Sequence, residues 1–266
     1  MRPLAGWPAD ERASIVGVLT DIDDTLTTEG AVTPDVLAAL DALARAGLHV
    51  MPITGRPVGW SEPFAQRWPV DAIVAENGAV ALTRGGTGGL RKLYIQDAAL
   101  RAANYERMQQ VARRIVAEVP GAALSRDSDG RETDIAIDHS EFTQLPQAAI
   151  DRVVALMRSE GMNATVSSIH VNGWYGDHNK LAGARWALRT LLGRDLDAEI
   201  DRWVYIGDST NDVLMFERFP HSVGVANIRR FEAQLAHKPR YITAGERGAG
   251  FAEVAAAILA ARGMSR

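Results

Sequence analysis

The stretch from Val16 to Leu26 constrains the fold more than any other part of the chain. Its first residues are mostly apolar, and they run directly into three carboxylates, Asp21, Asp23 and Asp24. An apolar run that ends in polar residues is typical of a buried strand followed by a loop, and open parallel α/β sheets carry their chemistry at such strand ends. Taken alone, the same carboxylates could equally cap a turn or the start of a helix.

The segments that follow this stretch predict an α/β fold. Thr33 and Pro34 mark the start of an amphipathic helix, Gly47 marks its end, and residues 49–54 form a second strand. A strand, a helix and a further strand in this order imply a right-handed crossover and parallel pairing. We therefore expect a doubly wound, mostly parallel, Rossmann-like sheet. Its remaining elements are predicted as strands at 72–75, 203–206 and 222–226 and helices at 181–192 and 251–261.

The pattern changes in the middle of the chain. Two long amphipathic helices, 105–119 and 146–160, alternate there with half-buried strands at 133–138 and 164–171. Helices segregated to one face of a small antiparallel sheet define the α+β class. This segment therefore predicts a small α+β cap domain.

The chain is thus predicted to contain two domains. A catalytic core is formed by residues 1–95 and 174–266, and the cap, residues 96–173, is inserted into it. The length of 266 residues allows two modest domains. Residues 1–14 lack the apolar segment of a signal peptide, so we expect them to form a short leader before the first strand.

Composition excludes several classes of protein. The formal net charge is -4 and no dense run of Lys or Arg occurs, so the charge pattern of a nucleic-acid-binding protein is missing. No apolar run is long enough to span a membrane. The absence of cysteine excludes disulfides, thiolate metal sites and cysteine nucleophiles. We expect a cytoplasmic protein with no nucleic-acid or membrane partner, and the sequence does not indicate an oligomeric state.

Polar residues follow each of the core strands. Because the carboxyl ends of adjacent parallel strands meet at one edge of a sheet, these side chains can converge there. Carboxylates suit a hard cation, whereas a hydroxyl and an ammonium suit phosphoryl oxygens. The residues in question are Asp21 and Asp23, Thr54, Asn77, Asp208 and Asp212, together with Lys180 at the start of a later helix.

These motifs resemble, in order, the four motifs of the haloacid dehalogenase superfamily of phosphohydrolases. The first motif is similar to Asp21-Ile-Asp-Asp-Thr-Leu26, the second to Ile-Thr54-Gly-Arg56, the third to Lys180 and the fourth to Gly207-Asp-Ser-Thr-Asn-Asp212. The position of the cap is similar to that of subfamily IIB, which includes sucrose-phosphate, mannosyl-3-phosphoglycerate and phosphoglycolate phosphatases. One departure is Asp24, because the family most often has glycine there.

The resemblance implies a role for each motif. Asp21 would be the nucleophile and Asp23 the general acid and base. Thr54 and Lys180 would hold phosphoryl oxygens. The implied cofactor is Mg²⁺, with Asp21, the Asp23 backbone carbonyl and Asp208 as ligands and with Asp212 and Asn211 completing the site or its outer shell.

Substrate-binding candidates come from both domains. In the core they are Gly55, Arg56 and Asn77, next to the predicted phosphate site, and in the cap they are Arg131, His170 and Asn172. An arginine such as Arg131 suits a second anionic group of the substrate, for example a carboxylate. The alternatives are an exposed arginine at a strand start for Arg131 and an ion pair with a nearby acid for Arg56.

The sequence therefore predicts a Mg²⁺-dependent phosphomonoester hydrolase that acts through an aspartyl-phosphate on a small phosphorylated metabolite. A sugar phosphate, a phosphoglycerate-type ester and phosphoglycolate are all compatible. A phosphomutase-type phosphotransferase shares this chemistry, although several cap arginines would then be expected. A non-catalytic binding protein with the same fold is the alternative from another class, and it would be expected to lack Asp21, Asp23 or Lys180.

Overall fold

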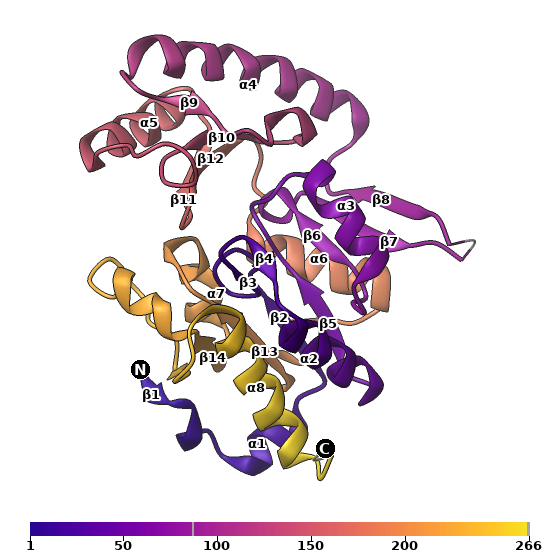
Figure 1. Ribbon diagram of the computed structural model, residues 1–266. Coiled ribbons are helices and arrows are strands. Elements are labelled where there is room, and N and C mark those ends of the chain that lie inside the picture. Colours follow the sequence, from indigo (N-terminus) through magenta and orange to yellow (C-terminus); the bar gives the residue numbers. More distant parts are fainter. Residues whose placement is uncertain (87, 265–266) are drawn as a thin grey trace.

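The central element of the fold is a parallel sheet. The computed structural model describes residues 1–86 and 88–264 (Figure 1). Within them, six strands pair in the order β1-β15-β14-β13-β2-β5, and every pair is parallel. The predicted fold class is confirmed. The strands are β1 (Arg2–Pro3), β2 (Gly17–Thr20), β5 (His49–Pro52), β13 (Trp203–Gly207), β14 (His221–Gly224) and β15 (Tyr241–Ile242).

Helices cover both faces of this sheet. Val18 of β2 belongs to one hydrophobic cluster and its neighbour Leu19 to another, because successive strand residues point to opposite faces. One cluster lies under α2 (Pro34–Arg45), α3 (Val58–Arg67) and α8 (Arg247–Ala261), and α1 (Ala9–Ser14) packs on α8. The other lies under α6 (Lys180–Leu192) and α7 (Val213–Arg218). None of the helices in the described ranges is long and apolar enough to cross a membrane.

Two smaller sheets extend the core. The first is antiparallel and contains β6 (Ile73–Ala75), β7 (Val80–Arg84) and β8 (Leu90–Tyr94). It meets the central sheet through a single parallel bridge between Ile53 and Val74. The predicted strand at 72–75 therefore exists, but its main partner is the β7 strand. The second small sheet is the hairpin of β3 (Thr27–Thr28) and β4 (Ala31–Val32), which directly follows the aspartate loop.

The middle segment folds into an antiparallel sheet covered by two helices. Its strands pair in the order β11-β12-β10-β9, and α4 and α5 pack on it around a hydrophobic cluster of their own (Figure 1). We call residues 96–173 the insert. Its elements are β9 (Ala123–Leu124), β10 (Ile135–Asp138), β11 (Asn163–Val166), β12 (His170–Trp174), α4 (Ala98–Glu118) and α5 (Gln147–Ser159). The α+β arrangement matches the prediction, whereas the limits of the insert as a separate domain stay a prediction.

Residues 1–14 pack on the core, and they contain a short strand, β1, that the sequence did not predict. β1 pairs in parallel with β15 at the edge of the central sheet. Trp7 is 1% exposed and stacks on Tyr241 with the ring centroids 5.6 Å apart. α1 contacts α8, where Arg12 donates to the Ala257 carbonyl at 3.2 Å. A two-residue strand is too short to leave a periodic pattern, so the sequence gives little sign of it.

Candidate active site

The nucleophile candidate lies where two central strands end side by side. Asp21 follows β2 and Asp208 follows β13, and these strands are neighbours in the sheet. The Asp21 backbone N–H donates to the Ile206 carbonyl at 2.8 Å, so the ladder continues to the catalytic position and fixes its register. Asp21, Asp208 and Asp212 each offer a carboxylate oxygen within 4.8 Å of the others, and all three are buried. The predicted convergence of strand ends is therefore observed.

Lys180 supplies a buried positive charge to this cluster. Its Nζ atom lies 2.6 Å from Asp21 Oδ1 and 2.7 Å from Asp212 Oδ1, and its side chain is 3% exposed. Burial opposes the charge, but the two carboxylates outweigh it and raise the pKa of Lys180 above its usual value. The ammonium therefore stays charged between the two acids.

A close backbone contact brings the start of α6 to this position. Asn179 caps the helix by accepting from the Ala182 N–H at 2.9 Å. Gly183, one turn into α6, lies against Gly78, and a Cβ atom on Gly183 would be 2.3 Å from the Gly78 Cα. Glycine is needed at both positions, because any side chain would move Lys180 away from Asp21.

Asp212 organises the loop after β13. Its Oδ1 atom accepts from Lys180 and from the Tyr205 hydroxyl at 2.5 Å, and its Oδ2 atom accepts from the backbone N–H groups of Asp208 and Ser209 at 3.0 and 3.2 Å. A Cβ atom on Gly207 would lie 2.4 Å from Asp212 Oδ2, so the loop requires glycine there. With both oxygens engaged, Asp212 is better suited to the outer shell of a metal than to direct ligation.

Asp208 is the least compensated acid of the site. It is fully buried; Oδ2 accepts from Asn227 at 3.1 Å, whereas Oδ1 has no hydrogen-bond partner. Burial, then the charges of Asp21 and Asp212, raise the pKa of Asp208 well above its ordinary value. Burial is also the main reason that the pKa of Asp21 is raised to about 7, against the opposing effect of Lys180. A divalent cation would stabilise the ionised forms of both Asp21 and Asp208, so this donor set fits the implied Mg²⁺.

Arg56 connects the acid/base candidate to the insert. Its Nε atom lies 2.9 and 3.1 Å from the two oxygens of Asp23. Its Nη1 atom contacts Asp127 Oδ2 at 3.2 Å, and its Nη2 atom contacts Glu141 Oε1 at 2.8 Å. Both of the latter acids belong to the insert and were not singled out in the sequence. The alternative in which Arg56 pairs with a nearby acid is the arrangement observed.

The second motif and Asn77 form a tight loop beside these residues. Thr54 is fully buried, and its hydroxyl accepts from the Arg56 N–H at 3.0 Å. The Asn77 N–H donates to the Thr54 carbonyl at 2.9 Å. The Gly55 carbonyl accepts from two insert side chains, Arg131 Nη1 at 3.0 Å and Asn172 Nδ2 at 3.3 Å. We call residues 54–56 the phosphate loop, in line with its predicted role.

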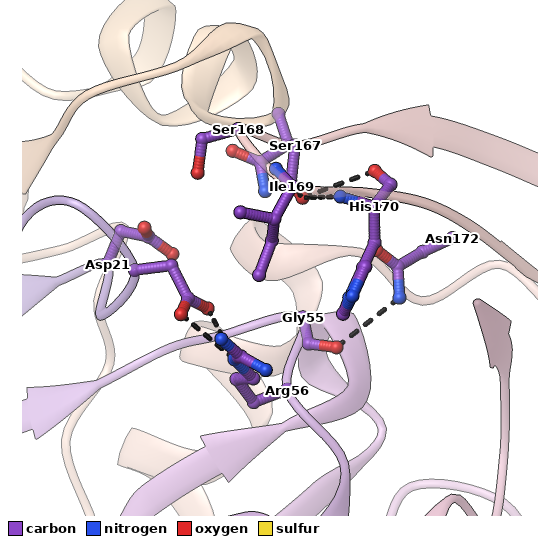
Figure 2. Close-up of a pocket in the computed structure, with 10 residues that line it drawn as sticks. Asp21, Gly55, Arg56, Ser167, Ser168, Ile169, His170 and Asn172 are labelled. Carbon is purple, nitrogen blue, oxygen red and sulfur yellow. Dashed lines mark hydrogen bonds and ion pairs between the residues drawn. The ribbon is translucent and has the colours of Figure 1, made fainter. Parts of the chain in front are cut away.

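A small cavity separates the core from the turn between β11 and β12. Figure 2 shows Asp21 and Arg56 of the core facing Ile169 and His170 of the insert, and a dashed line joins Gly55 to Asn172. The cavity volume is about 10 Å³, about the space of one water molecule. Of the predicted residues, the lining contains Asp21, Asp23, Gly55, Arg56, His170, Asn172 and Asn211, joined by Ser167, Ser168 and Ile169, which the sequence did not indicate.

Arg131 does not line this cavity. It is 4% exposed, and its guanidinium contacts Asp134 Oδ1 at 2.7 Å and Asp127 Oδ1 at 3.1 Å in addition to the Gly55 carbonyl. The expected contact of Arg131 with a substrate carboxylate therefore has no support in this geometry, and neither has the exposed alternative. His170 does face the cavity, with Nε2 2.9 Å from Glu141 Oε2.

The unusual residue of the first motif has a structural explanation. Asp24 adopts a left-handed backbone conformation with φ 54°, which glycine adopts with the least strain. Its Oδ1 atom contacts Arg247 Nε at 3.1 Å, and its Oδ2 atom contacts Arg230 Nη2 at 3.4 Å. The strain at Asp24 is therefore accompanied by two ion pairs that glycine could not make.

Comparison with known proteins agrees with this geometry. Residues 18–117 match the sequence model of the haloacid dehalogenase-like hydrolase family. No curated protein sequence matches the chain. Solved structures do: a Thermoplasma acidophilum protein has a TM-score of 0.68 at 15% identity, covering 94% of this chain and 99% of that one. The sucrose-phosphatase of Synechocystis, solved with sucrose and phosphate, has a TM-score of 0.65 at 16% identity, covering 91% and 97%.

A sugar phosphatase of haloacid dehalogenase subclass IIB is also similar, with a TM-score of 0.62 at 13% identity over 94% of this chain and 99% of that chain. The family model matches residues 18–117, and the solved structures show that the chain shares their fold. Because the likeness spans the insert as well as the core, the shared fold includes the α+β insert.

Proposed function

We propose that this protein is a Mg²⁺-dependent phosphomonoester hydrolase acting on a sugar phosphate. The observation that carries the proposal is the Lys180 ammonium held between Asp21 and Asp212, next to the buried Asp208 carboxylate, whose Oδ1 atom has no hydrogen-bond partner. A nucleophilic carboxylate, a fixed cation and an acidic metal site are what phosphoryl transfer through an aspartyl-phosphate requires. The family match and the sugar phosphatases among the similar structures support the same activity.

The proposed reaction has two displacements. Asp21 attacks phosphorus, the bond from phosphorus to the ester oxygen breaks, and the departing alkoxide takes a proton from Asp23. Water then attacks the aspartyl-phosphate while Asp23 accepts its proton, which releases phosphate and restores both carboxyl groups. Asp21, Asp208 and the Asp23 carbonyl would hold Mg²⁺, with Asp212 and Asn211 around them. When bound, Mg²⁺ would neutralise charge on the phosphoryl oxygens.

Lys180 and the phosphate loop stabilise charge in this scheme. The Lys180 ammonium already opposes the effect of burial on the pKa of Asp21, which favours the ionised nucleophile. The Thr54 hydroxyl and the ammonium are the donors proposed for the equatorial phosphoryl oxygens. Arg56, in contact with Asp23 at 2.9 Å, orients the proposed acid/base.

The chemistry of the insert favours a sugar over a carboxylated leaving group. Arg56 meets two insert carboxylates, Asp127 and Glu141, and the His170 imidazole contacts the second of these. Both carboxylates are paired with Arg56, so the His170 imidazole, which lines the cavity, is the group that we propose for contact with a sugar hydroxyl. The arginine that could bind a substrate carboxylate, Arg131, is already paired with two acids. The same pairing argues against a mutase, which must hold a second phosphate.

A panel of esters tests the proposal. We would measure phosphate release from sugar phosphates, phosphoglycerate and phosphoglycolate, with Mg²⁺ and with a chelator, using Asp21→Asn as the matched control. We expect Mg²⁺-dependent turnover of a sugar phosphate and none by the variant. Turnover by Asp21→Asn would refute the mechanism, and faster turnover of phosphoglycolate would refute the substrate class. Isomerised sugar phosphate without phosphate release would indicate the mutase, and binding without turnover a binding protein.

A further inference from the structure

A buried carboxylate outside the catalytic cluster joins the core to the insert. Glu76, which directly follows β6, has an exposed fraction of 0%. Its carboxylate accepts from the Val58 N–H of the core at 3.0 Å and from the Glu132 N–H of the insert at 3.0 and 3.1 Å. Thr133 of the insert adds its N–H and its hydroxyl. Three of the four donors therefore come from the insert.

The backbone at Glu76 adopts a strained conformation in which the side chain makes these contacts. Glu76 and Asn77 are consecutive non-glycine residues in the left-handed region, with φ 49° and 56°. Such conformations persist only where the surroundings over-determine them. Burial, and next the Asp134 charge, raise the pKa of Glu76 to about 7, whereas Thr133, the Val58 N–H and Arg131 oppose the rise. Burial of an ionised carboxylate is therefore unfavourable at Glu76, and the hydrogen bonds from its donors stabilise the ionised form.

The insert residues that Glu76 holds are next to residues that contact the phosphate loop. Arg131, adjacent to Glu132, donates to the Gly55 carbonyl at 3.0 Å. Asp134, adjacent to Thr133, accepts from Asn77 at 3.3 Å and from Asn172 at 3.0 Å, and Asn172 also donates to Gly55. A displacement of residues 131–134 would therefore remove both side-chain donors from the Gly55 carbonyl.

A second contact shows how closely the insert sits here. Gly130 lies against Gly59 in the first turn of α3, and a Cβ atom on Gly59 would be 2.9 Å from the Gly130 Cα. The backbones of the insert and the core are thus in direct contact next to the Glu76 carboxylate.

We propose that Glu76 is a positioning residue whose carboxylate docks residues 131–134 of the insert on the core and thereby fixes the phosphate loop. It does not touch the reacting atoms, and its effect on turnover passes through Arg131, Asn172 and the Gly55 carbonyl. The effect on turnover rests on the proposed function, whereas the docking of the insert does not.

The test separates docking from activity. The chain contains no cysteine, so Val116→Cys on the insert and Leu214→Cys on the core, each 46% exposed, can carry a pair of spin labels without other changes. In this labelled background, Glu76→Gln removes the charge but keeps the shape. The matched control is Glu253→Gln, which alters a carboxylate that accepts from two N–H groups of the core, Ala244 and Gly245, at 2.9 and 3.0 Å.

We expect Glu76→Gln to broaden and lengthen the distance distribution between the labels and to lower kcat for a sugar phosphate at least tenfold with a smaller change in KM. Glu253→Gln should change neither. Thr133→Ser keeps the hydroxyl donor and should behave as the unmodified protein, whereas Thr133→Val should give an intermediate distribution and an intermediate kcat. Such a graded series would not arise from general damage to the fold.

Three results would overturn the proposal. One is an unchanged distance distribution in Glu76→Gln, whatever its kcat. A second is an equal change in Glu253→Gln. The third applies if Glu76→Gln does not fold, because Thr133→Val is then the variant that tests the proposal. The proposal fails if the distance distribution of Thr133→Val equals that of the unmodified protein. If the unmodified protein has no phosphatase activity while Glu76→Gln shifts the labels, the docking stands and the proposed function fails.

Discussion

Replacement of Lys180 by methionine gives the sharpest test of the site. Methionine keeps the length of the side chain but removes the charge that lies 2.6 Å from Asp21 and 2.7 Å from Asp212. The exposed fractions of the three side chains are 3%, 5% and 0%, so water cannot replace the lost partner. Removal of one member of a buried ion pair costs about 3–5 kcal/mol, because the remaining charges stay buried and unpaired. This is a large part of the stability of an ordinary domain.

The control for this substitution is Lys92→Met. Lys92 is also held by two carboxylates, Glu62 at 2.6 Å and Glu132 at 2.9 Å, but its side chain is 35% exposed. Such a pair contributes about 0–1 kcal/mol. Urea unfolding in the presence of a chelator should therefore show a much larger loss in unfolding free energy for Lys180→Met than for Lys92→Met. Equal losses would refute the view that Lys180 compensates buried charge.

Stability and catalysis should then respond differently to a second substitution. Asp212→Asn in the Lys180→Met background removes one of the unpaired carboxylates, so the double variant should be more stable than Lys180→Met alone. It should not regain activity, because loss of a charge-stabilising donor lowers kcat by about 10²–10³. A further loss of stability on adding Asp212→Asn would show that the Tyr205 and backbone bonds of Asp212, and not its charge, dominate.

Three further predictions concern other parts of the site and its surroundings. Asp208→Asn should raise the melting temperature in the presence of a chelator, since it removes a fully buried charge whose Oδ1 atom has no hydrogen-bond partner. Mg²⁺ should then stabilise only the unmodified protein, and a variant that Mg²⁺ still stabilises would place the metal elsewhere. Asp24→Gly should leave the free energy of unfolding within about 1 kcal/mol of its original value, because relief of the left-handed strain offsets the loss of two partly exposed ion pairs. A larger decrease, measured by urea unfolding, would contradict this. Burial lowers the pKa of His178 from 6.5 to about 4. Between these two pH values the unfolded chain binds a proton that the folded protein does not, so the free energy of unfolding decreases as the pH falls from 6.5 to about 4. Between pH 7.5 and pH 5, the free energy of unfolding should fall by about 2 kcal/mol more in the unmodified protein than in His178→Gln. Equal decreases in the two proteins would refute this assignment.

The sequence predicted that Asp21 and Asp208 lie together because parallel topology fixes where strand ends meet. Asp21 and Asp208 are distant in the chain, but β2 and β13 are neighbours, and each strand leaves its first polar residue at the same edge. Local caps place Lys180 in the structure, since Asn179 precedes its helix and Gly193 ends it with φ 64°. Strand ends of a parallel sheet and helix caps each have a fixed geometry, so a sequence that contains them restricts where these side chains lie.

The contacts between core and insert could not be predicted in this way. Arg56 meets Asp127 and Glu141, which lie 71 and 85 residues further along the chain, and no periodic pattern links such positions. Asp127 lies beside a Ser-Asp-Gly turn, where an aspartate is ordinary. Arg131 was expected to bind an anionic group of the substrate, but it pairs with Asp127 and Asp134 of the insert itself. These three residues share no helix or strand, so no periodic pattern indicates their pairing.

The three aspartates of the opening loop illustrate the same division between local and long-range information. Each carboxylate contacts a cation from a different part of the chain: Asp21 contacts Lys180, Asp23 contacts Arg56, and Asp24 contacts Arg247. The left-handed turn at Asp24 lets its carboxylate reach Arg247 at the start of α8, so this departure from the family glycine brings its own counter-charge. Asp21, Asp23 and Asp24 therefore lie in three different electrostatic environments, because three distant elements each supply a separate positive charge.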